Sequence, residues 1–347
     1  MGDVLHALPV LVKLRARFPD ARIDWLVTPE NADLVRHHPA LSGVVIFERK
    51  GAGVTGWVRL LGRLREARYD LAIDLQGLLR SAVFSFATRA PVRIGFDRPR
   101  RPHLQKHGWA GAREFSWLAY THRIAIPTLD VHAIDRYLWL APVLGLDDAP
   151  PDTRVFLAPE AEESAGRLLA AHRLEKFAVL VPGTMWETKH WLPERFAEVG
   201  RALAERGFGV TVVGAPGERA LCASVAAQCP GAVDLCGKTS LAELAALLKK
   251  AAVVVTNDSG PMHLAVALGR PVVCVFGPTD PARVGPYRGL ESVVRAGLAC
   301  SPCHFRRLSQ CPYELACMKQ VTAAMVMERI DAVLPDAGEA AGSDSPR

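Results

Sequence analysis

Short apolar runs alternate along the chain with longer segments in which apolar residues recur at helical spacing. In the first half, the apolar runs predict strands at 23–27, 44–48, 71–75 and 92–96. The amphipathic segments between them predict helices at 29–36, 57–66 and 78–88. The strand segments hold few polar side chains, which is typical of strands buried on both faces. The alternation therefore predicts a parallel sheet with helices on both sides.

The second half repeats this pattern more regularly. Strands are predicted at 177–181, 208–213, 233–236, 253–255 and 271–276. Pro193 is typical of the first turn of a helix, and Gly207 is typical of the residue after its end. Ser240 and Glu243 have the spacing of a capping box, which marks a further helix start. Together these elements predict a complete doubly wound α/β unit.

The chain opens on a helix. Val4, Leu5, Leu8 and Leu11 recur at helical spacing, and Asp3 stands just before them. An aspartate in this place is most often an N-cap. Because a helix with nothing before it is an unusual start for an α/β domain, we expect that a first strand is missing upstream of Met1.

The segment 253–287 carries the clearest candidate site, since it reads as strand, tight loop, helix and strand. Asp258 or Ser259 is placed to cap the helix, Pro261 falls in its first turn, and Gly269 follows its end. A helix that starts directly after a buried strand presents free amides and the positive end of its dipole to an anion. We therefore expect a ligand that bears phosphate to bind at 258–260.

Composition sets the class of protein. The chain has 347 residues, of which 50% are hydrophobic, and a net charge of +6. That length allows two α/β domains, predicted at 1–150 and 151–334 with a linker at 147–153, and a disordered tail at 335–347. No run of about twenty apolar residues and no signal peptide is found, which favours a cytoplasmic protein. The basic balance suggests an acidic partner such as a nucleotide, a nucleic acid or an anionic membrane surface.

Further candidates lie where predicted strands end. Thr184 and Lys189 follow strand 177–181, and Glu218 follows strand 208–213. Gln76 and Arg80 follow strand 71–75, at the sheet edge where α/β folds bind ligands. A lone lysine or arginine in such a place is often only solvated, and Glu218 also suits the first turn of a helix on electrostatic grounds.

Two other segments contain clusters of side chains that could bind a ligand or a metal, one of arginines and one of cysteines. Residues 97–113 predict an irregular cationic loop that includes Arg98, Arg100 and Arg101, and arginine suits bidentate contact with phosphate or carboxylate. The alternative is a disordered, solubilising loop.

The tail holds four of the eight cysteines, which are Cys300, Cys303, Cys311 and Cys317. The first pair has the spacing of zinc ligands, whereas the second pair is too widely spaced for a standard zinc ribbon, so a structural metal stays open.

The residues 258–265 and 269–281 also carry a family resemblance. Their sequences, Asp-Ser-Gly-Pro-Met-His-Leu-Ala and Gly-Arg-Pro-Val-Val-Cys-Val-Phe-Gly-Pro-Thr-Asp-Pro, are similar to the signature of the ADP-heptose:lipopolysaccharide heptosyltransferases, glycosyltransferase family 9. The resemblance runs from Gly2 to the final predicted helix. It implies two Rossmann-like domains facing a cleft, the glycosyltransferase-B type. It also implies inverting transfer of heptose from ADP-heptose to the lipopolysaccharide inner core, at the inner face of the inner membrane.

The resemblance assigns roles to the candidates. On the donor side, Lys189 matches the lysine placed against the donor pyrophosphate, with Thr184, Glu218, Asp258, Ser259, Gly260 and His263 as further donor-binding residues. On the acceptor side, Asp3 becomes the base that activates the acceptor hydroxyl, instead of a helix cap. Gln76, Arg80, Arg98, Arg100 and Arg101 would contact the anionic inner core. No Asp-x-Asp motif stands near the donor segment, so we expect transfer that requires no metal or other cofactor.

Three alternatives stay open from the residues. A nucleotide-dependent dehydrogenase would need a Gly-x-Gly-x-x-Gly turn with an acid about twenty residues later, and the turns of this chain do not provide it. A homologue that binds nucleotide-sugar without catalysis is the second alternative, because the start at Met1 would impair the site. Nucleic-acid binding through the arginine loop ranks last, because the chain holds no recognisable nucleic-acid module.

Overall fold

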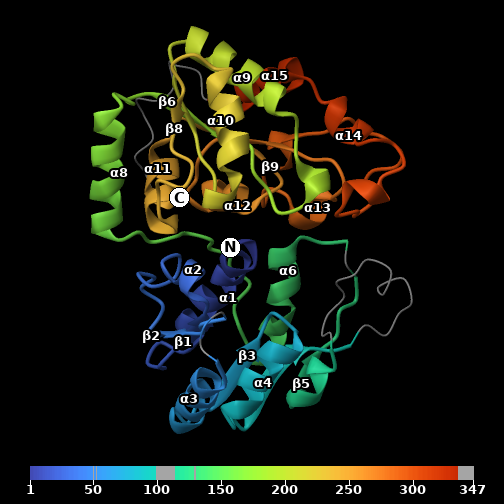
Figure 1. The fold of residues 1–347 in the computed structure, drawn as a ribbon. Coiled ribbons are helices and arrows are strands. Elements are labelled where there is room, and N and C mark those ends of the chain that lie inside the picture. The colour runs from blue at the N-terminus through green and yellow to red at the C-terminus, as the bar shows by residue number, and fades with distance from the viewer. Residues whose placement is uncertain (50, 52, 99–113, 129, 335–347) are drawn as a thin grey trace. The chain divides into compact units, whose positions relative to one another are not determined.

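The computed structural model describes residues 1–49, 51, 53–98, 114–128 and 130–334. The chain divides into two compact units, one of residues 3–156 and one that begins at Leu157. Figure 1 shows the elements of both, and each unit is described by itself. The predicted tail at 335–347 lies outside the described residues.

The first unit contains two small parallel sheets. Its opening helix is α1 (Gly2–Arg17). Strands β1 (Asp24–Val27) and β2 (Gly43–Ile46) pair in parallel, with the short helix α2 (Pro29–Ala32) between them. Strands β3 (Leu71–Asp74), β4 (Val92–Phe96) and β5 (His122–Ile124) form a second parallel sheet. The remaining helical elements are α3 (Gly53–Glu66), α4 (Leu79–Ala87), η1 (Ser116–Ala119), α6 (Ala133–Tyr137), η2 (Leu138–Leu140) and α7 (Ala141–Leu144).

Three details of this unit differ from the prediction. The helix expected at 29–36 is a single turn, α2, although Leu34 and Val35 beyond it are buried. Strand β5 was not predicted, because His122 and Arg123 are exposed and leave only Ile124 as an apolar signal. Met1 is the N-cap of α1 and Asp3 lies inside the first turn, so the reading of Asp3 as a helix cap was wrong.

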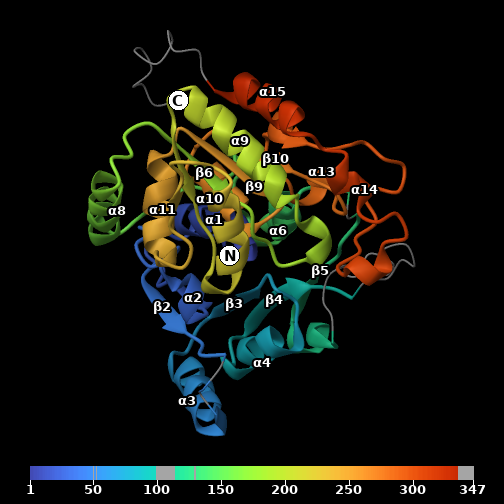
Figure 2. The same cartoon turned by 45° about the horizontal axis from the view of Figure 1, so that its top comes forward.

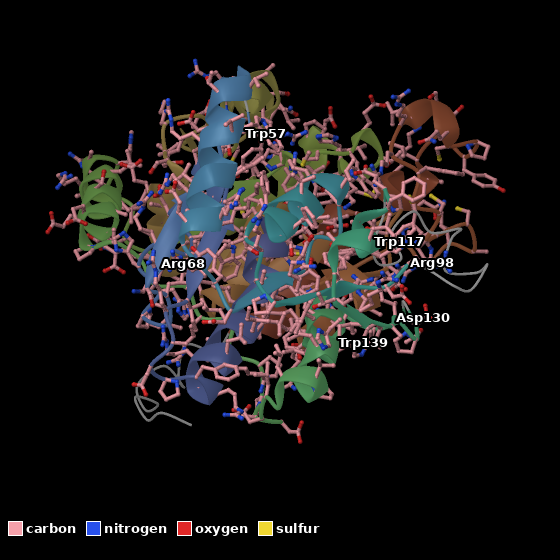
Figure 3. All side chains as sticks on the ribbon, turned by 90° about the horizontal axis from the view of Figure 1, so that it is seen from below. Trp57, Arg68, Arg98, Trp117, Asp130 and Trp139 are labelled. Carbon is pink, nitrogen blue, oxygen red and sulfur yellow. The ribbon has the colours of Figure 1, made fainter. Side chains whose placement is uncertain are left out.

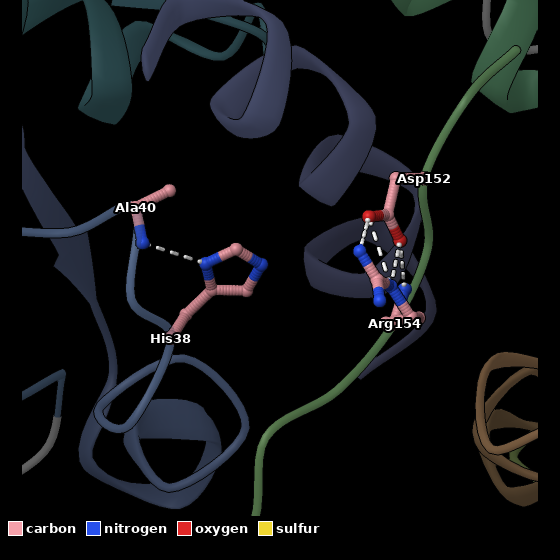
Figure 4. Close-up of polar contacts among 4 residues, drawn as sticks. All are labelled: His38, Ala40, Asp152 and Arg154. Carbon is pink, nitrogen blue, oxygen red and sulfur yellow. Dashed lines mark hydrogen bonds and ion pairs between the residues drawn. The ribbon is translucent and has the colours of Figure 1, made fainter. Parts of the chain in front are cut away.

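The segment predicted as the linker is held against the first unit. Lys13 donates from Nζ to the Asp147 carboxylate at 2.6 Å and to the backbone oxygens of Asp147 and Ala149. Further along, Asp152 and Arg154 form an ion pair (Figure 4). These contacts continue to the end of the first unit at Phe156, so residues 147–156 pack as part of that unit.

His38 packs against Phe156, the last residue of this segment. Its Nδ1 accepts a hydrogen bond from the Ala40 N–H at 3.1 Å, and its ring lies edge-on to Phe156 (Figure 4). Burial lowers the pKa of His38, because the charged imidazolium would lose solvation there. The neutral ring is therefore the form that packs against Phe156.

The second unit is built on one six-stranded parallel sheet with the order β11-β10-β9-β6-β7-β8. The strands are β6 (Phe177–Val181), β7 (Gly209–Val212), β8 (Val233–Asp234), β9 (Val253–Asn257), β10 (Val272–Val275) and β11 (Val293–Val294). All residues of β6, β9 and β10 are buried, as expected for strands covered on both faces. The predicted doubly wound α/β class is confirmed in this unit.

Helices cover this sheet. They are α8 (Pro159–Ala171), α9 (Pro193–Glu205), α10 (Arg219–Ala227), α11 (Leu241–Lys250), α12 (Gly260–Ala267), α13 (Pro281–Val284), α14 (Ala316–Lys319) and α15 (Ala323–Val333), with short turns η3 (Glu187–Lys189), η4 (Pro216–Glu218), η5 (Leu290–Ser292) and η6 (Leu308–Gln310). Helix α8 packs against α11, and α15 packs against α9 (Figure 2). The predicted capping box forms at the start of α11, where the Ser240 hydroxyl and the Glu243 carboxylate each accept from the other residue's backbone N–H.

The order of the strands fixes where a ligand can bind. From β6 the chain moves outward to β7 and β8, then returns to β9 on the other side of β6. The loops that follow β6 and β9 therefore leave the sheet in opposite directions. In open α/β sheets the crevice between two such loops, at the carboxyl ends of the strands, is the usual ligand site.

In the part of the chain that is described, no helix combines the length and apolarity needed to cross a membrane.

Candidate functional site

The candidate site lies at this switch point, and a buried asparagine ties its two loops together. Asn257 is the last residue of β9 and has no exposed surface. Its Nδ2 donates to the Pro182 carbonyl at 2.8 Å, and its Oδ1 accepts from the Trp191 N–H at 3.1 Å. Because Pro182 and Trp191 bound the loop after β6, this one side chain holds both ends of that loop against β9.

Asp258 is the centre of the polar contacts. It is 4% exposed, and its Oδ2 lies 2.7 Å from Lys189 Nζ. The Thr279 hydroxyl donates to the same carboxylate oxygen at 2.5 Å, and the Thr184 hydroxyl donates to the Asp258 backbone oxygen at 3.0 Å. Three loops, after β6, β9 and β10, therefore converge on one aspartate.

Lys189 is held by two partners. Besides the Asp258 carboxylate, its Nζ lies 4.2 Å from the centroid of the Trp186 ring, within the range of a cation–π contact. The lysine side chain is 13% exposed, so a ligand can still reach it. The buried carboxylate opposite the ammonium and the ring beside it fix the position of the Lys189 side chain. The arrangement places a cation of fixed position, whose charge is paired with that of Asp258, at the edge of the sheet.

The start of α12 adds backbone donors beside this cation. Ser259 is the N-cap residue, but its side chain makes no capping hydrogen bond and instead shares one with the Thr256 hydroxyl at 2.9 Å. The amides at the start of the helix are therefore left without a side-chain acceptor, which favours an anion there. Gly260 begins the helix, and His263 lies half-buried one turn further on.

Glu218 is brought to the same edge from the next strand connection. Its Oε2 accepts from the Ala215 N–H at 2.8 Å, which holds the carboxylate over the start of η4. A Cβ placed at Gly183 would lie 2.1 Å from this carboxylate, so the loop after β6 packs directly on Glu218. The structure thus places Glu218 beside the loop that carries Thr184.

The four tail cysteines line one cavity of about 310 Å³ together with Phe305 and Tyr313. All four are free thiols. Burial and the neighbouring cysteines raise the pKa of Cys317 to about 11. Among the described residues, no group of three or more histidine, cysteine or acidic side chains is arranged to hold a metal ion. The predicted clustering is therefore seen, whereas a metal centre is not.

This cysteine segment supports two of the loops that meet at Asp258. Near Lys189, the Thr188 hydroxyl donates to the Phe305 carbonyl at 2.5 Å, and the Glu187 carboxylate accepts from the Leu308 N–H at 2.9 Å. Near Thr279, the His304 N–H donates to the Pro278 carbonyl at 2.7 Å. One segment therefore braces two of the three loops that meet at Asp258, a role that its sequence did not reveal.

The predicted acceptor residues lie on the first unit and are not joined to one another. Gln76 donates its N–H to Asp74 at 2.9 Å, and Arg80 lies 5.5 Å from the Phe47 ring. Arg98 is exposed after β4, and Asp3 is exposed in α1. No hydrogen bond or ion pair links any two of Asp3, Gln76, Arg80 and Arg98 as the structure describes them. Arg100 and Arg101 lie outside the described residues.

Asn257 is a site residue that the sequence did not single out, and Thr279 stood out only as part of the family signature, without a role in the site. Thr279 lies within the family signature, and Asn257 directly precedes Asp258. Either could have been found by asking which polar residues follow the three neighbouring buried strands. That question identifies the residues at one edge of the sheet, although not their partners.

Comparison with known proteins agrees with this geometry. The model of glycosyltransferase family 9 (heptosyltransferase) matches residues 57–314. The lipopolysaccharide core heptosyltransferase OpsX of Haemophilus influenzae is 27% identical over 85% of this chain and 81% of its own length. Lipopolysaccharide heptosyltransferase 1 of Pseudomonas aeruginosa is 32% identical over 87% of this chain and 83% of its own.

A solved relative shows the same fold. The E. coli heptosyltransferase WaaC is 27% identical and matches over 96% of both chains, with a TM-score of 0.71 in its structure with ADP. In its structure with ADP-2-deoxy-2-fluoro heptose the TM-score is 0.68 at the same identity and coverage.

Proposed function

The chain belongs to glycosyltransferase family 9, the heptosyltransferases, and we propose that it moves heptose from ADP-heptose to a Kdo or heptose hydroxyl of the lipopolysaccharide inner core. The observation that carries the proposal is the Lys189–Asp258–Thr279 cluster beside the open start of α12. It combines a fixed cation with free helix amides at the switch point of a nucleotide-type sheet. That combination suits a diphosphate.

On the donor side, the residues stabilise the departing ADP. As the bond between the anomeric carbon and the diphosphate breaks, negative charge grows on the diphosphate oxygens. Lys189 and the amides at Ser259 and Gly260 would receive that charge, and one such preorganised contact is typically worth about 3 kcal/mol. Asp258 and His263 would orient the donor, and Glu218 and Thr184 would contact it from the neighbouring loops.

On the acceptor side, Asp3 is the proposed base. The acceptor hydroxyl oxygen attacks the anomeric carbon from the face opposite ADP, which inverts that centre, and its proton passes to the Asp3 carboxylate. Arg80 and Arg98, with Gln76, would bind phosphate and carboxylate groups of the inner core. Because this acceptor is anchored in lipid, we place the enzyme at the inner face of the inner membrane.

The alternative of a nucleotide-dependent dehydrogenase is not favoured. The matched relatives carry the names of heptosyltransferases, and the strand-to-helix turns of the second unit lack the Gly-x-Gly-x-x-Gly sequence that such a dehydrogenase would need. A homologue that only binds nucleotide-sugar would bind ADP without turnover, and the assay below separates it from a transferase.

The test follows ADP release from ADP-heptose with deeply truncated lipopolysaccharide as acceptor. We expect turnover by the wild type in the presence of EDTA. The variant Asp3→Ala should lose transfer while its ADP affinity stays near that of the wild type, because a base touches the acceptor and not the nucleotide. Asp20→Ala, another exposed aspartate near α1, is the matched control. An equal loss of transfer and of ADP affinity in Asp3→Ala would contradict the assignment of Asp3 as the base.

A further inference from the structure

Arg283 is an arginine that the fold buries. It lies in α13 and is 8% exposed, whereas most arginines that the structure describes are half-buried or exposed. Arg68 and Arg98 of the first unit, both exposed and labelled in Figure 3, show the ordinary case. Arginine is almost never buried in proteins unless its charge is paired. A partner for the Arg283 guanidinium is therefore expected.

Two lysines in similar surroundings have such a partner. Lys13 is 6% exposed, and its Nζ lies 2.6 Å from the Asp147 carboxylate. The Lys189 side chain is 13% exposed, and its Nζ lies 2.7 Å from the Asp258 carboxylate. In both places the fold supplies an acid opposite the cation, which offsets the solvation that the cation loses on burial.

At Arg283 the fold supplies no acid. Its Nε is buried without a hydrogen-bond partner, and no hydrogen bond or ion pair reaches its guanidinium from the residues that the structure describes. The nearest acid along the chain is Asp280, whose carboxylate accepts from the Ala282 N–H at 3.0 Å as the N-cap of α13. A buried cation without a partner lowers the stability of the fold. Such an exception to the packing rules is typical of a residue that serves a ligand.

The chain brings Arg283 close to the cluster at Asp258. The loop after β10 carries Thr279, whose hydroxyl donates to the Asp258 carboxylate, and leads into α13 at Pro281. Thr279 and Arg283 are four positions apart, which limits the distance between their Cα atoms to about 14 Å. Pro281 and Arg283 are buried, whereas Ala282 between them is exposed, so Arg283 lies on the inward side of α13. Figure 1 shows α12 and α13 at the same end of the second unit.

The charge at these loops points to an anionic ligand. Residues 182–192, 258–259 and 276–284, which follow β6, β9 and β10, contain one lysine, Lys189, and one arginine, Arg283. The charge of Lys189 is paired with that of Asp258, so this pair alone is electrically neutral. Arg283 adds a positive charge that no carboxylate of the described chain takes up. Its planar guanidinium can donate two parallel N–H bonds to phosphate oxygens.

We infer that Arg283 binds the diphosphate of the donor nucleotide. The guanidinium donates to the phosphate oxygens, and the diphosphate provides the anionic partner that the fold does not. The free protein therefore holds a buried cation at a cost in stability, and the bound nucleotide removes that cost. The inference rests on the proposed function for the identity of the nucleotide, but it concerns binding and not transfer.

Calorimetric titration, with urea unfolding of the same preparations, tests the inference. Arg283→Met should bind ADP about tenfold or more weakly, because a charged contact to the diphosphate is lost. Adenosine, which has no phosphate, should bind as it does to the wild type. Without nucleotide, the variant should unfold at a higher urea concentration than the wild type, because an apolar side chain replaces a buried, unpaired charge. A gain in stability together with a loss of affinity is the mark of a binding residue and not of a residue that only supports the loop.

Two further variants serve as controls. Arg283→Lys keeps the charge without the planar fork, so its ADP affinity should lie between those of the wild type and Arg283→Met. Arg167→Met removes an arginine of α8 whose side chain is 72% exposed. Because surface ion pairs contribute little, it should change neither the ADP affinity nor the urea midpoint.

An Arg283→Met protein that binds ADP like the wild type would overturn the inference and leave the proposed function standing. A loss of ADP affinity together with a lower urea midpoint would also overturn it, because Arg283 would then hold the loop in place. So would an unchanged ADP affinity with a raised KM for the acceptor, which would assign Arg283 to the acceptor side. If ADP binding depends on Arg283 but no acceptor elicits ADP release from ADP-heptose, the proposed transfer fails and this inference holds.

Discussion

Two buried aspartates stand at the carboxyl ends of parallel strands, and their partners differ. Asp258 directly follows β9 in the second unit and is paired with the Lys189 ammonium and the Thr279 hydroxyl. Asp74 ends β3 in the first unit, and it accepts from the Tyr120 hydroxyl at 2.6 Å and from the amides of Gln76 and Gly77. Both are 5% exposed or less.

The difference separates a proposed binding site from a turn. Asp74 has only neutral donors, and burial raises its pKa because the charged form loses solvation without a cation to replace it. Its hydrogen bonds fix the loop after β3. Asp258 holds the Lys189 cation, which an arriving diphosphate would share under the proposed function, and its contacts join three loops. A buried carboxylate at a strand end therefore indicates a ligand site when its partner is a cation that remains accessible.

The largest effect is expected when the cation of the Asp258 pair is removed. Lys189→Met should lower kcat/KM for heptose transfer by about 10²–10³-fold, because a fixed positive charge opposite the leaving diphosphate is lost. It also leaves a buried carboxylate without its cation, so the second unit should unfold at lower denaturant concentration. The measurement is ADP release under saturating acceptor, with urea unfolding in parallel. Retention of more than half of the wild-type kcat/KM would contradict the role of Lys189.

A smaller and different effect is expected at Asp74. Asp74→Ala should cost about 2–3 kcal/mol of unfolding free energy, because it leaves the Tyr120 hydroxyl and two amides without their acceptor. ADP affinity should stay at the wild-type value, since these contacts belong to the first unit. Urea unfolding and ADP titration of the same preparation measure both. Loss of ADP affinity with unchanged stability would reverse the assignment of the two aspartates.

The smallest effect concerns pH. The folded pKa of Asp74 lies above the ordinary value of 3.8, so just above pH 3.8 the folded state keeps a proton that the unfolded state releases. The contribution of the protonated Asp74 to the free energy of unfolding is complete below pH 3.8. It is lost as the pH rises through the raised pKa of the folded state. Asp74→Asn cannot ionise, so its stability relative to the wild type should increase over this rise. Urea unfolding at a series of pH values measures the difference, and parallel curves for the two proteins would rule out the raised pKa.

The sequence predicted the fold of the second unit closely, because fully buried parallel strands leave an unmistakable apolar pattern. The strand-to-helix turn at Asp258–Gly260 was predicted for a local reason, because the pattern of a helix that starts after a strand lies within one short segment. The hydrogen bond from Thr279 to Asp258 was not predicted, because it joins residues twenty-one positions apart through the register of two strands. The contacts from the cysteine segment to the loops after β6 and β10 join residues still further apart in the sequence, and the spacing of the cysteines gave no sign of them.

The first unit was predicted less well. Its strands are short and half-exposed, so β5 gave no signal, and the helix at 29–36 was predicted too long. The N-cap reading of Asp3 failed because the helix starts one residue after Met1. The exposure of Leu79, Val83 and Phe86 on α4 was equally hidden, since the spacing of these residues is that of an ordinary core stripe.

ADP titration by calorimetry tests the central claim most directly, that the cation held by Asp258 binds the donor diphosphate. Lys189→Met should weaken ADP binding about tenfold or more, as expected for the loss of one charged contact. Asp74→Asn and Lys176→Met, the latter removing an exposed lysine of the same unit, should bind ADP like the wild type. An unchanged ADP affinity in Lys189→Met, or an equal loss in Asp74→Asn, would contradict the account.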